Sequence, residues 1–90
     1  NQLSLLPEIP VEVFELDCSY NQLTALPKMP DEISELYCSY NQLTSLPEMP
    51  DSLETLKCSN NKFKYTNLDE YKLMLKKLKT KNKLIRLSEI

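Results

Sequence analysis

Polar and apolar residues alternate in three short stretches of the chain. The stretches read ELD at 15–17, ELY at 35–37 and TLK at 55–57, so each holds one leucine between two more polar residues. A period of two is typical of a strand that buries one face and exposes the other. We therefore predict three short strands, centred on Leu16, Leu36 and Leu56.

After residue 67 the apolar residues follow a helical period instead. Four of them stand at i, i+3, i+4 and i+7 and form one stripe: Tyr71, Met74, Leu75 and Leu78. Asn67 and Glu70 have the spacing of a capping box, which favours a helix start at this point. These signals predict an amphipathic helix over roughly 68–80. The last stretch, KLIRLSEI at 83–90, fits a strand, a second helix or a connection to a partner.

The chain repeats itself every twenty residues. Residues 1–20 and 21–40 are identical at twelve of twenty positions, and residues 41–60 match the second block at twelve positions too. A fourth block opens with NKF at 61–63 and then changes composition. Within the blocks the buried pattern reads L-x-x-L-x-C-x-x-N-x-L, as in Val13, Leu16, Cys18, Asn21 and Leu23. A repeat of this kind predicts stacked units that share one continuous core.

This pattern resembles the leucine-rich repeat family, with cysteine in one buried aliphatic position. The twenty-residue unit is similar to the short L-P-x-L-P type of secreted effectors of enteric bacteria and of giant-virus repeat proteins. The resemblance implies a solenoid with short parallel strands on the concave side and extended or polyproline II segments on the convex side. We expect repeats over 1–63 and a helical cap with a tail over 64–90, because a terminal repeat needs a polar outer face.

Prolines fill the second half of each block, in LPEIP, LPKMP and LPEMP. Prolines at this density exclude a regular helix and favour an extended backbone. We expect Leu26 and Met29, and likewise Leu46 and Met49, to point inward. The prolines also satisfy P-x-x-P, the ligand pattern of aromatic-grooved domains, but the repeat explains their spacing by itself.

The cysteines return in one frame, at Cys18, Cys38 and Cys58. A zinc site needs thiolates that converge on one ion, and a disulfide needs Cβ atoms about 3.8 Å apart. A column with one cysteine on each strand points in one direction without converging. We therefore expect three small buried apolar side chains beside a ladder of asparagines, Asn21, Asn41 and Asn61. Reduced thiols favour the cytoplasm or another reducing compartment, such as a host cytosol or a virion.

The composition lacks histidine, glycine and tryptophan. Histidine is the commonest general base and metal ligand, so its absence argues against an enzyme, a metal site or a cofactor. The ubiquitin-ligase domain that follows such repeats in some effectors does not carry over, because no cysteine stands in its C-x-D motif. Without glycine, we expect asparagine at the turns that need positive φ. No apolar run is long enough for membrane insertion.

Charge is divided between the two parts of the chain. Residues 1–63 hold ten acidic side chains and three lysines, whereas residues 64–90 hold eight basic and three acidic side chains. The basic tail allows nucleic-acid binding as a distant third function. Arg86 is the only arginine among these basic residues, and no aromatic residue follows Lys72, so a solvated helix face is the simpler interpretation.

The resemblance places the variable positions of each block on the concave face, where they would bind a partner. These candidate residues are Glu15, Asp17, Glu35, Tyr37, Thr55, Lys57, Tyr20 and Tyr40. The acidic members favour another protein with a basic surface, rather than a small-molecule substrate. We therefore expect a non-enzymatic protein–protein interaction module. A solvated face without a partner is the alternative for these residues.

A structural component of a large assembly, such as a viral capsid or coat, is the second function that we consider. Three repeats make a thin core, and docking into an assembly would add stability.

Overall fold

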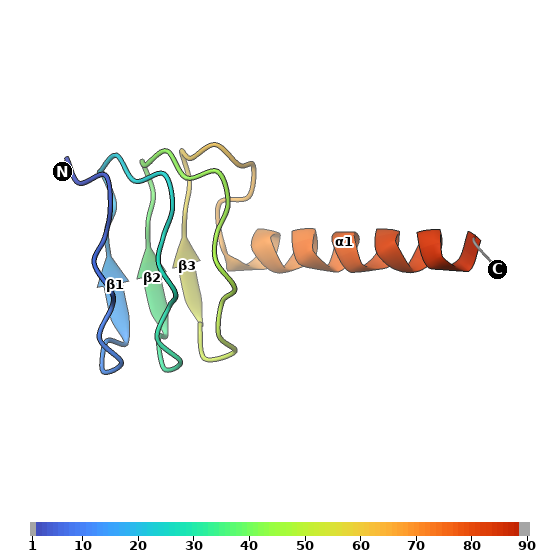
Figure 1. Cartoon of the computed structure of the whole chain (residues 1–90), viewed down its shortest axis with the longest axis horizontal. Coiled ribbons are helices and arrows are strands. Elements are labelled where there is room, and N and C mark those ends of the chain that lie inside the picture. The colour runs from blue at the N-terminus through green and yellow to red at the C-terminus, as the bar shows by residue number, and fades with distance from the viewer. Residues whose placement is uncertain (1, 89–90) are drawn as a thin grey trace.

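The computed structural model describes the backbone of residues 2–88 and the side chains of residues 2–78. It contains three parallel strands in one open sheet and a C-terminal helix: β1 (Glu15–Asp17), β2 (Glu35–Tyr37), β3 (Thr55–Lys57) and α1 (Leu68–Ser88). The strands lie in the order β1-β2-β3, as Figure 1 shows. The prediction of three strands centred on the leucines is confirmed.

The register of the sheet follows the twenty-residue block. Leu16 pairs with Leu36, which in turn pairs with Leu56. The ladder continues beyond the strands, because Cys18 N–H donates to the Tyr37 carbonyl at 2.8 Å and Cys38 N–H donates to the Lys57 carbonyl at the same distance. Each block therefore repeats the hydrogen bonds of the previous one, and its side chains stack in columns.

The strands form one side of the body and the extended segments form the other (Figure 1), and the core residues come from both. The members of this core share near-complete burial: Cys18, Leu23, Met29, Ile33, Leu36, Cys38, Leu43, Leu53, Leu56, Cys58 and Tyr71. Leu26, Leu46 and Met49 of the proline segments are partly buried against this core, as predicted. Pro30 is buried, whereas Pro7 and Pro10 are exposed.

The asparagine ladder forms as predicted and joins neighbouring blocks. The side-chain amide of Asn41 donates to the carbonyls of Cys18 and Cys38 at 3.0 and 3.1 Å, and its Oδ1 accepts the N–H of Leu23 at 3.0 Å. Asn61 makes the same set of contacts one block later. Because these side chains satisfy backbone groups that the turn leaves unpaired, they close the core at the end of each strand.

Positive φ angles occur at one position of each block, and the prediction of asparagine there is wrong for two of the three. The residues are Tyr20 (63°), Tyr40 (59°) and Asn60 (58°). The turn after each strand imposes the left-handed conformation on whatever residue stands there. Asn60 tolerates it, whereas Tyr20 and Tyr40 adopt it at a cost.

Helix α1 begins where predicted, but it continues to Ser88. Asn67 Oδ1 accepts the N–H of Glu70 at 2.9 Å, which is half of the predicted capping box. The Glu70 carboxylate reaches Thr66 instead of Asn67, at 2.8 Å from its backbone nitrogen. The stretch 83–88 is therefore the end of one helix rather than a strand or a second helix.

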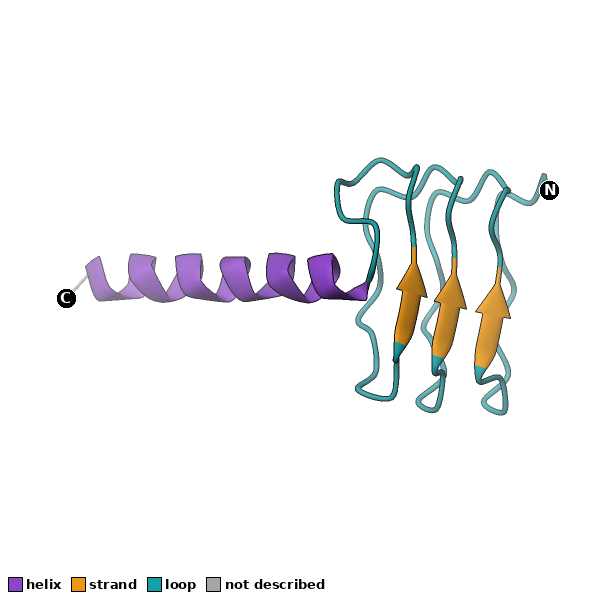
Figure 2. Cartoon of the chain, turned by 180° about the vertical axis from the view of Figure 1, so that it is seen from behind, coloured by secondary structure: helices purple, strands orange, loops and turns teal. Residues whose placement is uncertain are grey.

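Only the first turns of α1 cover the open end of the sheet. Tyr71 is buried at 5% exposure and Met74 packs against the core. Leu75 and Leu78 are 37% and 52% exposed, so this part of the predicted apolar stripe is not buried against the body. The reason is the direction of the helix, which leaves the body along the stacking axis of the strands (Figure 2).

Candidate functional site

The outward side chains of the three strands form one surface, which we call the strand face. It consists of two rows in register: Glu15, Glu35 and Thr55, then Asp17, Tyr37 and Lys57. Each strand turns its leucine into the core, so the residues on either side of that leucine point outward. The structure therefore places six of the eight predicted residues together on this face.

A groove lies at the carboxyl end of the strands. It has a volume of about 550 Å³ and is lined by Asp17, Ser19, Tyr20, Asn21, Tyr37, Ser39, Tyr40 and Lys57. Five of the predicted residues lie in it, namely Asp17, Tyr20, Tyr37, Tyr40 and Lys57. Glu15, Glu35 and Thr55 lie one row away and do not line it.

Two tyrosines form one wall of the groove. The rings of Tyr20 and Tyr40 are stacked and remain exposed by 61% and 47%. Both residues have a positive φ angle. The wall therefore offers a flat aromatic surface that no residue of the described chain covers.

Tyr37 is held in place by its neighbour on the same strand. Its hydroxyl donates to Oε1 of Glu35 at 2.5 Å. This hydrogen bond, partial burial and the carboxylates of Glu35, Glu15 and Asp17 raise the pKa of Tyr37 above its ordinary value. The phenol is therefore a neutral donor that is fixed between acidic side chains. This pair was not predicted from the sequence, although residues two apart on a strand share a face.

The cysteine column lies beneath this face and is packed rather than exposed. All three thiols are free and buried. Burial, together with the Asp17 carboxylate, raises the pKa of Cys18 from 9.0 to about 11, and burial raises that of Cys38 still further. Since the thiolate is the reactive form, these side chains are poor nucleophiles at neutral pH.

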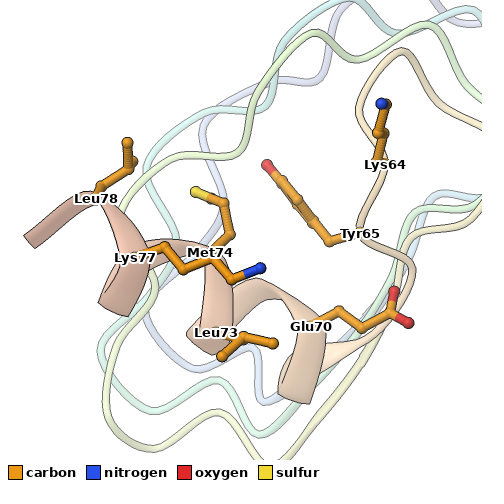
Figure 3. A pocket seen from close by; sticks show the side chains of 7 residues that line it. All are labelled: Lys64, Tyr65, Glu70, Leu73, Met74, Lys77 and Leu78. Carbon is orange, nitrogen blue, oxygen red and sulfur yellow. The ribbon is translucent and has the colours of Figure 1, made fainter. Parts of the chain in front are cut away.

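A second hollow lies where α1 leaves the body (Figure 3). It has a volume of about 420 Å³ and is lined by Lys64, Tyr65, Glu70, Leu73, Met74, Lys77 and Leu78. This hollow could not be predicted from the sequence, because it depends on the angle at which the helix leaves the sheet. In the described part of the chain, no helix combines the length and the apolar character needed to span a membrane.

Comparison of the chain with protein-family models, with curated proteins and with solved structures gave no match.

Proposed function

We propose that the chain is a short leucine-rich repeat solenoid that acts as a non-enzymatic interaction module and binds another protein through its strand face. Three features support the repeat assignment: the twenty-residue block, one strand in each block, and an in-frame register between the blocks. An interaction role suits this arrangement, because stacked units present an extended surface built from equivalent positions.

The groove carries the functional part of the proposal. Its central row changes from Asp17 to Tyr37 to Lys57, whereas the buried cysteines beside it do not change. The packing residues are thus constant, and the exposed position varies in charge and shape from block to block. Aromatic rings, a fixed phenol and charges of both signs are the groups that recognise a protein surface.

The partner that fits this face best is basic. Glu15, Asp17 and Glu35 lie on two adjacent strands, and Lys57 on the third strand is the only cation of the strand face. Carboxylates held this close together attract lysine or arginine side chains and increase the rate of encounter. The exposed rings of Tyr20 and Tyr40 add a site for cation–π contacts with the same side chains.

A titration followed by NMR tests this proposal. The probe is a synthetic leucine–lysine peptide of about 14 residues, which matches helix-in-groove recognition, and the control is its leucine–glutamate counterpart. We expect the basic peptide to shift the amide signals of Asp17, Tyr37 and Ser39. The variant Glu15→Gln/Asp17→Asn/Glu35→Gln should bind it about tenfold more weakly. Shifts confined to other parts of the chain, or equal binding of both peptides, would contradict the proposal.

A role in a large assembly is the second candidate, and the open edge of β1 favours it. β1 is an edge strand of the sheet, and three apolar side chains of the first block are largely exposed: Leu5 at 72%, Val11 at 74% and Phe14 at 61%. An edge of this kind pairs readily with another chain. Thermal unfolding separates the two candidates: a single cooperative transition of the isolated chain above about 60 °C would argue against a need for assembly.

We also propose that the chain works in a reducing compartment. Cys18, Cys38 and Cys58 are free and buried, and their packing role does not require oxidation.

A further inference from the structure

The groove and helix α1 run in the same direction. Asp17, Tyr37 and Lys57 line the groove from three successive strands, so the groove crosses the sheet rather than following one strand. Helix α1 projects from the end of the body along that same stacking direction (Figure 2). A helix that is presented in this way has the orientation needed to lie along the groove of another molecule.

The charges of these two elements are complementary. α1 carries seven basic and two acidic side chains, and both acids stand in its first turn. The strand face carries Glu15, Asp17 and Glu35 against one lysine. Among the described side chains of the helix, Lys72, Lys76 and Lys77 are all exposed. The helix is therefore the type of basic element that the strand face favours.

One molecule cannot bring its own helix and groove together. α1 follows the far side of β3 and points away from the sheet (Figure 1). Tyr71 holds its first turn against the body, where its hydroxyl lies 3.5 Å from the Pro47 carbonyl. A second copy is the nearest source of a complementary surface.

Apolar contacts support the same pairing. Leu73 is 51% exposed and stands three and four residues before Lys76 and Lys77, so the three share one helix face. In the groove, the rings of Tyr20 and Tyr40 form an exposed aromatic wall. A leucine packs on such rings, and a neighbouring lysine interacts with their faces.

We propose that two copies of the chain pair reciprocally, with α1 of each copy lying across the strand face of the other. The inference rests on the proposed function, because it assigns a partner to the same groove. A two-fold arrangement uses both helices and both grooves, so the assembly closes as a dimer instead of growing into a fibre.

Sedimentation velocity of the full chain tests the pairing. We expect a monomer–dimer equilibrium with a dissociation constant on the order of 10 µM, as suits a small and polar interface. Raising the salt concentration should weaken the dimer severalfold, because exposed charges are screened. A monomer at all accessible concentrations in low salt would overturn the inference.

Two charge-reversed variants make the test specific. The face variant is Glu15→Lys/Asp17→Lys/Glu35→Lys, and the helix variant is Lys72→Glu/Lys76→Glu/Lys77→Glu. Each variant alone should be monomeric, because its helix and its face then carry the same sign. Their equimolar mixture should form a mixed dimer, because each helix again meets a face of opposite charge. This recovery also shows that both variants are folded.

The matched control is Glu8→Lys/Glu48→Lys/Asp51→Lys, which changes the net charge equally but lies on exposed positions away from the strand face. It should dimerise like the unmodified chain. A mixture of the face and helix variants that stays monomeric, or a control that no longer dimerises, would contradict the inference. If the chain is monomeric and still binds the basic peptide in the groove, self-pairing is wrong and the proposed function stands.

Discussion

The rings of Tyr20 and Tyr40 stack with their centroids 4.6 Å apart and their planes 7° from parallel. The backbone of both residues is in the left-handed region, which costs a residue other than glycine about 1–2 kcal/mol. The contact between the rings offsets part of this cost. The same contact forms the flat aromatic wall of the groove.

A double-mutant cycle on Tyr20→Ala and Tyr40→Ala should therefore reveal a coupling free energy of about 0.5–1.5 kcal/mol. Chemical denaturation of the four proteins gives this value directly. The pair Gln22→Ala and Gln42→Ala is the control, because both side chains are exposed at equivalent positions of neighbouring blocks. Strictly additive effects of the two tyrosine substitutions would show that the rings do not support each other.

Asn41 is expected to be the most sensitive polar side chain of the body. It is 8% exposed and satisfies the carbonyls of Cys18 and Cys38 and the N–H of Leu23. Asn41→Ala leaves these buried groups unpaired, so the free energy of unfolding should fall by about 2–4 kcal/mol. Urea denaturation measures the loss. A loss below about 0.5 kcal/mol, as for an ordinary surface position, would mean that water replaces the side chain.

Stability should decline at alkaline pH because of the buried thiols. The pKa of Cys18 and that of Cys58 rise from 9.0 to about 11 in the folded chain. The folded state holds these protons more tightly than the unfolded state does. Their contribution is therefore complete below pH 9 and is lost as the pH approaches 11.

The measurement is the free energy of unfolding as a function of pH. Cys18→Ala should reduce the alkaline slope by up to about 1.4 kcal/mol per pH unit, because it removes one such proton. Tyr71, whose pKa is also raised by burial, contributes in the same direction above its ordinary value of 10.0. An alkaline slope that is identical in Cys18→Ala would show that the thiol does not titrate between the two states.

Tyr71 should decide whether α1 stays attached to the body. Its ring is buried and lies 5.4 Å from that of Tyr65, at an angle of 60°. Tyr71→Ala should cost about 3–5 kcal/mol and reduce the helical circular dichroism signal, because the first turn loses its anchor. Leu73→Ala, two residues later on an exposed face of the helix, should cost less than about 1 kcal/mol. Equal losses of stability in the two variants would show that Tyr71 does not anchor the helix to the body.

The repeat made most of the body predictable. Leu16, Leu36 and Leu56 occupy equivalent positions, so the same local pattern occurs three times in the sequence. This repetition allowed the strands, their register and the asparagine contacts to be predicted. The left-handed residues were harder to predict, because hydrophobicity does not encode backbone angles. The available signal was the alignment of Tyr20 and Tyr40 with Asn60, a residue that tolerates positive φ.

The helix was predictable at its start and not in its direction. Asn67 marked the N-terminus through a local hydrogen bond, which a short sequence window contains. Whether Leu75 and Leu78 become buried depends on the angle between α1 and the sheet. The first turn of the helix is held against the body by Tyr71, whose hydroxyl contacts the carbonyl of Pro47, a residue 24 positions earlier in the chain. The groove itself was not predicted, because its form depends on how side chains of three blocks lie next to one another. Five of the residues that line it were nevertheless among the predicted binding residues.

The asparagine ladder has a consequence for how such a gene can change. Asn41 binds carbonyls of its own block and of the preceding block, and Asn61 does the same. The asparagine of each block therefore binds a backbone carbonyl of the block before it. An in-frame duplication of one block would insert a unit that already matches both neighbours. The number of blocks can therefore change by whole units at little cost to folding, and each added block extends the strand face by two outward residues.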